Sequence, residues 1–499
     1  MTTRDCVTKY YASPKRDKMI KEQIITEFKN AFCTYKTQSL RGIGIECEIP
    51  VVTEEGEAVS LSVIQAMFSY LKKQGFEIEW DESTDLMIAA KRTNHKSAEK
   101  FDYHFDTITT DTAFSTLEIV LAPQDNLHTI QEQLSNLLQT LLPFFNEKKV
   151  LLLGYGIQPL TSPSRKLLMP KERYRFFEKL STNNIIPISE GADSSFLNLS
   201  ASNQCHLEIN AKDAIRATNV LNALSGLQII LHANSPIWKG QIDPNYKASR
   251  EMFWDISFPN RRNQTGIPPK FENIESYVDY LFQFKPSLVK REGRYLQILN
   301  KTTFEEYLLN TFPAIGCTID GKQLEVEPKK EDFQQLIPFS WFNVRLVPKY
   351  GTIESRMCCQ QPFGSNLTTA ALTLGIIENL PAAEELSNIY SLAHWRVIRK
   401  QAAHHGFDTR IKGESILPLL KDMLDVATEG LQKRDLQEAV FLQPLYKRLE
   451  QRQAPADVAI KVFKEGGMDA LLKQLSLKKE DYKRHLSIVK QSTLATIKK

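Results

Sequence analysis

The sequence has no apolar segment long enough to span a bilayer. Its most hydrophobic runs, such as Val150 to Leu153, end within a few residues at Gly154, whereas a membrane helix needs roughly 20 consecutive apolar residues. The N-terminus also lacks the apolar core of a secretory signal, and acidic residues such as Asp5 argue against a transit peptide. These absences predict a soluble, cytoplasmic protein with no membrane partner.

The sequence contains few cysteines and has only a small net positive charge. The seven cysteines are widely spread, with no CxxC pair and no Cys/His cluster of metal-site spacing, which predicts free thiols and argues against a structural zinc. Lys plus Arg total 63 against 59 Asp plus Glu, a net charge of +4. That balance is too small for a dedicated nucleic-acid-binding protein.

Several familiar catalytic signatures are missing as well. There is no GxxxxGK[ST], no GxGxxG after a strand, no GxSxG and no Cys/His nucleophile signature. Phosphate-loop enzymes, dinucleotide-binding enzymes and serine hydrolases are therefore not favoured. What is present is a chain of 499 residues, 42% hydrophobic and 24% charged, which is enough for one large domain or two or three smaller ones.

Strand and helix patterns are mixed along the first two thirds of the chain. Alternating apolar residues predict strands over 41–50, where Pro50 closes the run, and over 76–80, 114–121, 202–210 and 342–357. Helical apolar spacing predicts helices over 17–35, 60–74, 126–146 and 211–233. The pattern predicts an α+β fold around a large, mainly antiparallel sheet.

From about residue 365 the predicted structure is almost wholly helical. The runs lie near 366–379, 381–404, 415–434, 436–452 and 455–475. We therefore expect three parts: an N-terminal helical lead-in (1–40), a sheet-bearing catalytic portion (41–365) and a helical C-terminal portion (366–499).

Acidic residues on the predicted strands are the main chemical signal. Glu46 and Glu48 are two residues apart on one strand, so they share a face at roughly 7 Å and would repel by about 2 kcal/mol at an effective dielectric near 20. Glu118 and Glu354 lie on two other predicted strands among apolar residues. Four such carboxylates converging on one face would suit Mg²⁺ or Mn²⁺ ions that also hold nucleotide phosphates. For any single glutamate, a place on the solvated face of a sheet is the simpler interpretation.

Two further residues on these strands leave alternatives open. His206, on the predicted strand 202–210, could ligate a metal or make a structural hydrogen bond. Arg356 is two residues from Glu354, so it could neutralise that carboxylate or reach a phosphate.

Taken in order, short segments over nearly the whole chain resemble the glutamate–cysteine ligase family in the form shared by plants and many proteobacteria. Gly44-Ile-Glu-Cys-Glu48 is similar to that family's first acidic strand, and Met169-Pro-Lys-Glu-Arg-Tyr174 to its M-P-K-x-R-Y segment. Further matches are Glu118 with Ala122-Pro123, Ala233-Asn-Ser-Pro236, Ser249-Arg250, Trp254, Arg262 with Gly266, and Val344 to Arg356, which resembles V-R-L-K-x-Y-x-E-x-R.

Two segments depart from the family pattern. Thr110 to Leu117 replaces a glycine-rich approach to the second acidic strand, and only Asp332-Phe333 and the following Leu336 to Trp341 represent a D-W-x-x-H-L-T-T segment. We therefore expect the substrate pocket to differ in detail, while the acidic face is retained.

The resemblance implies a glutamine-synthetase-like fold, in which a curved antiparallel sheet holds metal, ATP and an amino acid on its concave face. It implies ATP-dependent ligation of the γ-carboxylate of L-glutamate to the amine of L-cysteine through a γ-glutamyl phosphate, the first step of glutathione synthesis. The alternative is a related ligase that uses another amino acid, a polyamine or a peptide as the amine. Monomer and homodimer both stay open.

The resemblance also assigns roles to individual residues. Mg²⁺ or Mn²⁺ would be held by Glu46, Glu48, Glu118 and Glu354, with His206 as a further ligand. Arg173 and Arg250 would hold the carboxylates of glutamate, because a planar guanidinium matches a carboxylate. Arg345 and Arg356 would contact the nucleotide phosphates, and Arg356 and Lys171 would assist the chemistry.

Overall fold

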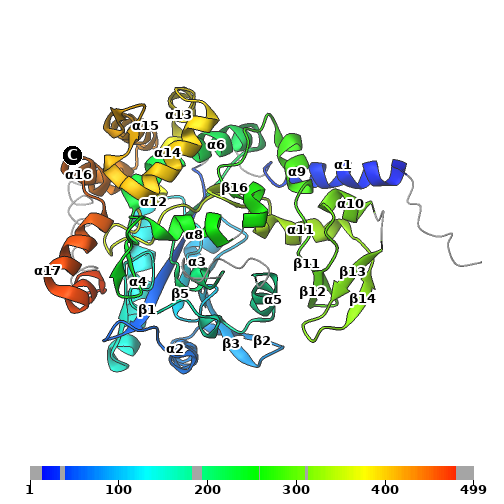
Figure 1. Ribbon diagram of the computed structural model, residues 1–499, viewed down its shortest axis with the longest axis horizontal. Helices are drawn as coiled ribbons and strands as arrows, with labels where there is room; N and C mark the ends of the chain where they lie inside the picture. The colour runs from blue at the N-terminus through cyan, green and yellow to red at the C-terminus, as the bar shows by residue number, and fades with distance from the viewer. Residues whose placement is uncertain (1–13, 34–39, 182–193, 258, 310–312, 479–499) are drawn as a thin grey trace, which may run out of the picture.

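The computed structural model describes residues 14–33, 40–181, 194–257, 259–309 and 313–478, and its centre is a nine-stranded sheet (Figure 1). Eight strands follow the order β16-β17-β7-β1-β5-β4-β3-β2, and β6 also pairs with β1. Every pairing in this sheet is antiparallel. The strands are β1 (Ile43–Thr53), β2 (Glu77–Asp81), β3 (Leu86–Thr93), β4 (Phe105–Thr110), β5 (Thr116–Val120), β6 (Val150–Leu152), β7 (Asn203–Glu208), β16 (Val344–Val347) and β17 (Thr352–Ser355). The predicted α+β architecture with a mainly antiparallel central sheet is confirmed.

The middle strand, β1, separates an apolar face of the sheet from a polar one. The buried apolar side chains on its first face are those of Ile43, Ile45, Cys47 and Ile49, and because successive side chains alternate, Glu46 and Glu48 lie on the other face. The expectation that Pro50 closes this strand is wrong, since β1 continues to Thr53. Pro50 lies where β1 changes its neighbour from β7 to β6, a position at which the missing N–H leaves no ladder bond unmade.

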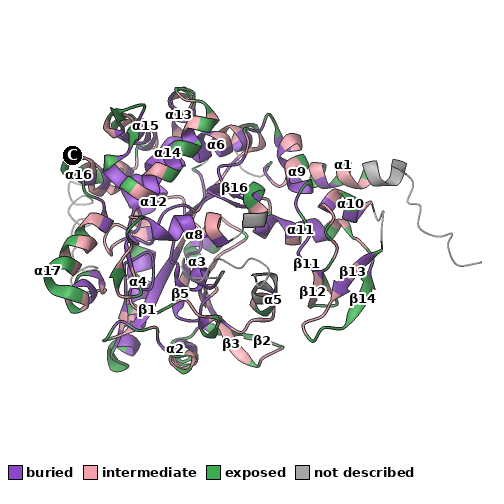
Figure 2. Cartoon of the chain, viewed as in Figure 1, coloured by how far each residue is buried: buried purple, intermediate pink, exposed green. Residues whose placement is uncertain are grey.

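Helices bury the apolar face of the sheet, and Figure 2 shows the central strands as mostly buried. Those in contact with the strands are α2 (Leu61–Lys73), α4 (Leu127–Glu147), α6 (Ala211–Ala223) and α12 (Thr368–Glu378). The predicted helix 211–233 is two helices, since α6 ends before Leu224 and α7 (Ser225–His232) follows. Gly226 lies at the break, where a β-carbon would stand 2.9 Å from the backbone of Arg399, so the close approach of α7 to the later helix α14 (Leu392–His405) requires glycine here.

The C-terminal part of the described chain is largely helical, with interruptions that the sequence pattern did not indicate. The predicted run 381–404 is divided into α13 (Leu380–Ser387) and α14, and the run 436–452 begins with a 3₁₀ helix, η8 (Glu438–Leu442). The other helices are α15 (Leu417–Lys433), α16 (Gln443–Gln451) and α17 (Pro455–Leu475), with a short hairpin of β18 (Arg410–Ile411) and β19 (Glu414–Ser415). α12 and α15 meet at Gly375 and Gly430, and α12 also contacts β7.

A second, four-stranded antiparallel sheet, which the sequence did not predict, lies at the end of the molecule opposite α16 and α17 (Figure 1). Its strands are β11 (Leu288–Arg291), β12 (Arg294–Ile298), β13 (Ala314–Cys317) and β14 (Gln323–Val326). The remaining helices are α1 (Pro14–Asn30), α3 (His95–Ala98), α5 (Glu172–Ser181), α8 (Ser249–Ser257), α9 (Ile274–Phe282), α10 (Phe304–Leu308) and α11 (Phe333–Leu336). Short strand pairs are β8 (Ile237–Trp238) with β9 (Gln241–Ile242), and β10 (Thr265–Gly266) with β15 (Trp341–Phe342).

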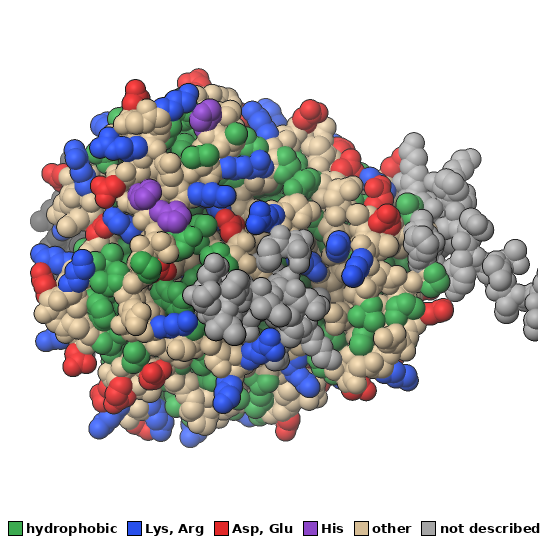
Figure 3. Space-filling view, in the orientation of Figure 1, with side chains coloured by type: hydrophobic (Ala, Val, Ile, Leu, Met, Phe, Trp, Pro, Cys, Tyr) green, Lys and Arg blue, Asp and Glu red, His purple; other side chains and the backbone are tan. Residues whose placement is uncertain are grey.

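Neither the charge on the visible surface nor the cysteines indicate a further functional site. Figure 3 shows basic and acidic side chains interspersed over the visible face. Among the helices of the described residues, none has both the length and the apolar character needed to cross a bilayer. The six cysteines in the described part of the chain are free thiols, and Cys6, like residues 479–499 of the predicted C-terminal portion, lies outside it.

Candidate active site

The register of the central sheet gathers the predicted acidic residues on one face. Glu48 on β1 lies opposite Glu118 on β5, and His206 on β7 lies opposite Glu354 on β17. Glu46 lies opposite Gln204, two residues before His206 on the same face of β7. Directly opposite residues of antiparallel strands point the same way, so strands up to 308 residues apart in sequence contribute to one row of ionisable side chains.

A cavity of about 290 Å³ opens over this row. Of the residues predicted for the site, it is lined by Glu46, Glu48, Glu118, Arg173, His206, Arg250, Arg345, Glu354 and Arg356. Lys171 does not line it but lies behind it, where its Nζ donates to Thr109 Oγ1 at 3.0 Å and to the Thr110 carbonyl at 2.9 Å. The strands, the first turn of α5 and α8 thus bring nearly all of the predicted side chains together.

The cavity also has lining residues to which the sequence analysis gave no role. They include Asp111, Tyr174, Gln204, Trp254, Trp341 and Tyr350. Tyr174, Trp254 and Tyr350 stand inside the family-like segments, so those motifs contained a signal for them. Asp111 belongs to the segment that departs from the family pattern, and its position after β4 carried no such signal.

A second cavity of about 540 Å³ continues along the same face and shares Glu46, His206 and Tyr350 with the first. Its wall includes the aromatic side chains of Phe101 and Tyr103. The two cavities together therefore give the polar face of the sheet room for more than one ligand.

Glu354 is the best-paired carboxylate of the row. The Nε of Arg345 donates to its Oε2 at 2.5 Å, the Nη2 of Arg345 donates to its Oε1 at 3.2 Å, and the Nη1 of Arg356 also donates to Oε1. Burial alone would raise the pKa of Glu354, but the two guanidinium groups outweigh it and hold the pKa well below its usual range. Glu354 is therefore ionised, and it fixes both arginines at the edge of the cavity.

The other end of the row carries a surplus of negative charge. Burial raises the pKa of Glu118 well above its usual range, and Glu46, Asp111 and Glu48 raise it further. Burial, together with Glu48, raises the pKa of Asp111 to about 7. Lys171 is close to both groups, but burial lowers its own pKa. These carboxylates are short of positive charge, and hard divalent cations are the ions that carboxylate oxygens prefer.

The geometry fits a cation that keeps part of its water or binds together with a substrate. Within the described residues, no three Asp, Glu, His or Cys side chains form a group that could hold a metal ion by themselves. Mg²⁺ is usually held by one or two carboxylates, with waters and substrate phosphates completing its shell. One or two of the carboxylates of Glu46, Glu48 and Glu118, which line the cavity, are therefore the available protein donors for such an ion.

Glu48 and His206 are held by specific contacts. Glu48 accepts hydrogen bonds from the backbone N–H of Ser202 at 2.5 Å and from Gln204 Nε2 at 2.8 Å. The Nε2 of His206 lies 3.1 Å from Glu46 Oε1. Burial acts to lower the pKa of His206, but Glu46 and Glu354 outweigh it, so its pKa is raised. When His206 is protonated, it pairs with Glu46 in this arrangement.

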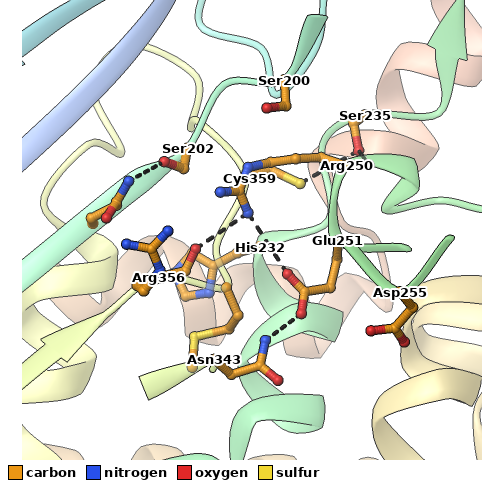
Figure 4. Close-up of polar contacts among 12 residues, drawn as sticks. Ser200, Ser202, His232, Ser235, Arg250, Glu251, Asp255, Asn343, Arg356 and Cys359 are labelled. Atoms are coloured by element: carbon orange, nitrogen blue, oxygen red, sulfur yellow. Dashed lines mark hydrogen bonds and ion pairs between the residues drawn. The ribbon is translucent and has the colours of Figure 1, made fainter. Parts of the chain in front are cut away.

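Arg250 presents a buried and incompletely satisfied guanidinium to the cavity (Figure 4). It is 2% exposed, its Nη1 donates to the carbonyl of Arg356 at 3.2 Å, and its Nε has no partner among the described residues. The neighbouring Glu251 lies 3.7 Å from it but pairs more closely with Arg399, at 2.8 Å. Arg250 therefore retains positive charge and a donor for an anionic ligand.

Comparisons with known proteins point to one family. Residues 43–474 match the sequence model of glutamate–cysteine ligase family 2. The chloroplastic glutamate–cysteine ligase of Arabidopsis thaliana is 23% identical over 355 residues, which are 69% of this chain and 64% of that protein. Glutamate–cysteine ligase A of Oryza sativa subsp. indica is 23% identical over 356 residues, with 69% and 68% covered.

A solved structure shares the fold. The crystal structure of glutamate–cysteine ligase from Francisella tularensis in complex with AMP matches 92% of this chain and 94% of that one, with a TM-score of 0.52 and 13% identity. The matched stretch of this chain thus spans nearly all of the bacterial structure, but only 64% of the Arabidopsis relative.

Proposed function

Since this chain belongs to glutamate–cysteine ligase family 2, we propose that it joins the γ-carboxylate of L-glutamate to the amine of L-cysteine at the expense of ATP, the first step of glutathione synthesis. The observation that carries the proposal is one cavity lined by both carboxylates and arginines. Amide formation from a carboxylate and ATP brings two anions together. Arginines can bind these anions directly, and carboxylates can hold a divalent cation that offsets the charge of the phosphates. We also propose that the fold is of the glutamine-synthetase-like type.

The proposed chemistry follows from the poor reactivity of a carboxylate. The γ-carboxylate attacks the terminal phosphorus of ATP, and ADP leaves. The amine of cysteine then attacks the carbonyl carbon of the γ-glutamyl phosphate, inorganic phosphate leaves and the amine loses a proton. The chain contributes mainly the positioning of the reactants and the stabilisation of charge.

The carboxylates have two separate tasks in this proposal. Glu46, Glu48 and Glu118 would hold Mg²⁺ or Mn²⁺, which, when bound, offsets the charge of the phosphates. Glu354 belongs to the same row, but both of its oxygens are engaged by Arg345 and Arg356. Glu354 could bind the metal only if one of these arginine contacts were broken. While the contacts are made, Glu354 holds both guanidinium groups in position for the nucleotide phosphates.

The substrates are assigned by charge and by space. Arg250 and Arg173 line the smaller cavity and would hold the carboxylates of glutamate. The larger cavity, with Phe101 and Tyr103 in its wall, would take the nucleoside, so that the phosphates reach the shared edge at Glu46. Lys171 would steady Glu118 from behind rather than contact a substrate.

The test is ATP-dependent release of phosphate by the purified protein with Mg²⁺ and L-glutamate, against a panel of amines. We expect turnover that requires L-cysteine, and Arg250→Ala should raise the KM for glutamate by about tenfold or more, since it removes a charged hydrogen bond. Arg410→Ala, an exposed site on the β18–β19 hairpin, is the matched control and should leave the KM unchanged. Turnover with another amine but not with cysteine would overturn the proposal.

A further inference from the structure

A third cavity, of about 710 Å³, lies among α4, η8, α16 and α17. Figure 1 shows α4, α16 and α17 on the side of the molecule away from the second sheet. The cavity shares no lining residue with the two cavities on the polar face of the central sheet. Its volume is in the range of sites that enclose a small organic ligand, and the proposed function gives it no task.

The wall of this cavity is basic and contains no carboxylate. Among its described lining residues there is no Asp or Glu, whereas Lys447 and Arg448 are both present. Phe441, Val458 and Leu475 supply an apolar surface, and several glutamines supply amide donors and acceptors. A wall of this composition favours an anion that carries an apolar body.

Arg448 is the residue that points to the ligand's charge. It is 8% exposed, and its Nη1 donates to the Leu231 carbonyl at 2.9 Å and to Gln361 Oε1 at 2.8 Å. No Asp or Glu of the described residues contributes to the electrostatics of Arg448, and burial lowers its pKa to about 10. A guanidinium has five N–H donors, so the two bonds of Nη1 leave most of its donors for another acceptor.

Other buried arginines of the described chain have the carboxylate partner that Arg448 lacks. Arg399 pairs with Glu251 at 2.8 Å and with Asp255 at 2.8 Å, and Arg434 pairs with Glu438 at 2.6 Å. A buried cation without an anion is costly, and at Arg448 a cavity lies where the anion would be.

We propose that this cavity binds a small organic carboxylate with an apolar body. Its carboxylate pairs with Arg448, within reach of the positive charge of Lys447. The apolar body packs against Phe441, Val458 and Leu475. The inference does not depend on the proposed function, because no residue of the cavity belongs to the catalytic face.

Calorimetric titration of the full-length protein with decanoate, below its micelle concentration, tests the proposal. Decanol has the same chain without the charge, and we expect decanoate to bind about tenfold more tightly or better, as a charged hydrogen bond to a guanidinium implies. Inorganic phosphate carries charge without the apolar body and should not bind at this cavity. Equal binding of decanoate and decanol, displacement of bound decanoate by an equal concentration of phosphate, or no binding of decanoate would overturn the proposal.

Two variants locate the binding. Arg448→Met should reduce the affinity for decanoate by about tenfold or more, while Lys461→Met, an exposed site on α17 outside the cavity, should not. Val458→Asp places a negative charge in the wall at a position that is 38% exposed, so it is expected to fold even if Arg448→Met does not. It should weaken decanoate but not decanol. Wild-type affinity for decanoate in Val458→Asp would contradict the assignment.

Discussion

Replacing Glu354 with glutamine should destabilise the protein strongly, because it removes a buried charge that two arginines share. Glu354 is 1% exposed and accepts hydrogen bonds from Arg345 and Arg356. Removing one partner of a buried ion pair costs about 3–5 kcal/mol. Arg345 keeps longer contacts to the carbonyls of Pro338 and Ser340, at 3.3 and 3.4 Å, so we expect the lower half of that range, about 3 to 4 kcal/mol.

The pH dependence of the loss provides a second check. The folded state lowers the pKa of Glu354 from 4.5, so its contribution to stability is fully present above pH 4.5 and declines as the pH falls. The difference between wild type and Glu354→Gln should shrink by about 1.4 kcal/mol for each pH unit below 4.5.

Urea unfolding followed by tryptophan fluorescence, at pH 7 and at pH 3.5, measures both effects. Glu79→Gln is the control, since Glu79 pairs with Lys91 on the same sheet but is half-exposed, and it should change the free energy of unfolding by less than about 1 kcal/mol. A Glu354→Gln protein within 1 kcal/mol of wild type at pH 7 would refute the reasoning.

Three further predictions concern the acidic residues Glu118 and Asp111 and the contact between α12 and α15. Glu118→Gln should stabilise the metal-free protein, because it removes a carboxylate whose charge is disfavoured first by burial and then by the neighbouring acidic groups. It should weaken Mg²⁺-dependent binding of an ATP analogue by about tenfold or more, and unchanged nucleotide affinity in a fluorescence titration would contradict the assigned role. The folded state raises the pKa of Asp111 from 3.8 to about 7, so the stability of the protein declines as the pH rises through that interval. Because Asp111 is ionised at pH 8, Mg²⁺ should raise the Tm more at pH 8 than at pH 6. Equal increases in Tm would count against a cation at this site. A β-carbon at Gly430 would lie 1.9 Å from the carbonyl oxygen of Gly375, so Gly430→Ala should cost about 3 kcal/mol in thermal or urea unfolding, whereas the exposed Gln432→Ala should cost almost nothing.

The polar face of the sheet was predictable because its signal is local. Glu46 and Glu48 alternate with buried residues on one strand, and the period of two alone assigns them to a shared face. The family resemblance, now confirmed, supplied what periodicity could not, namely that Glu118, His206 and Glu354 belong to the same site. The ligand-binding and metal-binding roles of these residues stay predictions.

Other features were not predictable, for identifiable reasons. Asp111 follows β4, and only the pairing of β4 with β5 brings it near Glu118. The helix break at Leu224 depends on the contact between Gly226 and α14, more than 170 residues later in the chain. The continuation of β1 beyond Pro50 depends on where its neighbours β7 and β6 stop and start. Each of these is a tertiary effect with no local pattern.

The place of β1 in the sheet has a consequence for how the protein is made. Its three partner strands are contributed by residues 116–120, 150–152 and 203–207, and the hairpin that carries Glu354 begins only at Val344. A nascent chain therefore exposes β1 with unpaired edges long before it can complete the row, and such edges are prone to aggregation. Because like charges repel, the carboxylates of Glu46 and Glu48 should oppose the pairing of this exposed strand with the same strand of a second nascent chain.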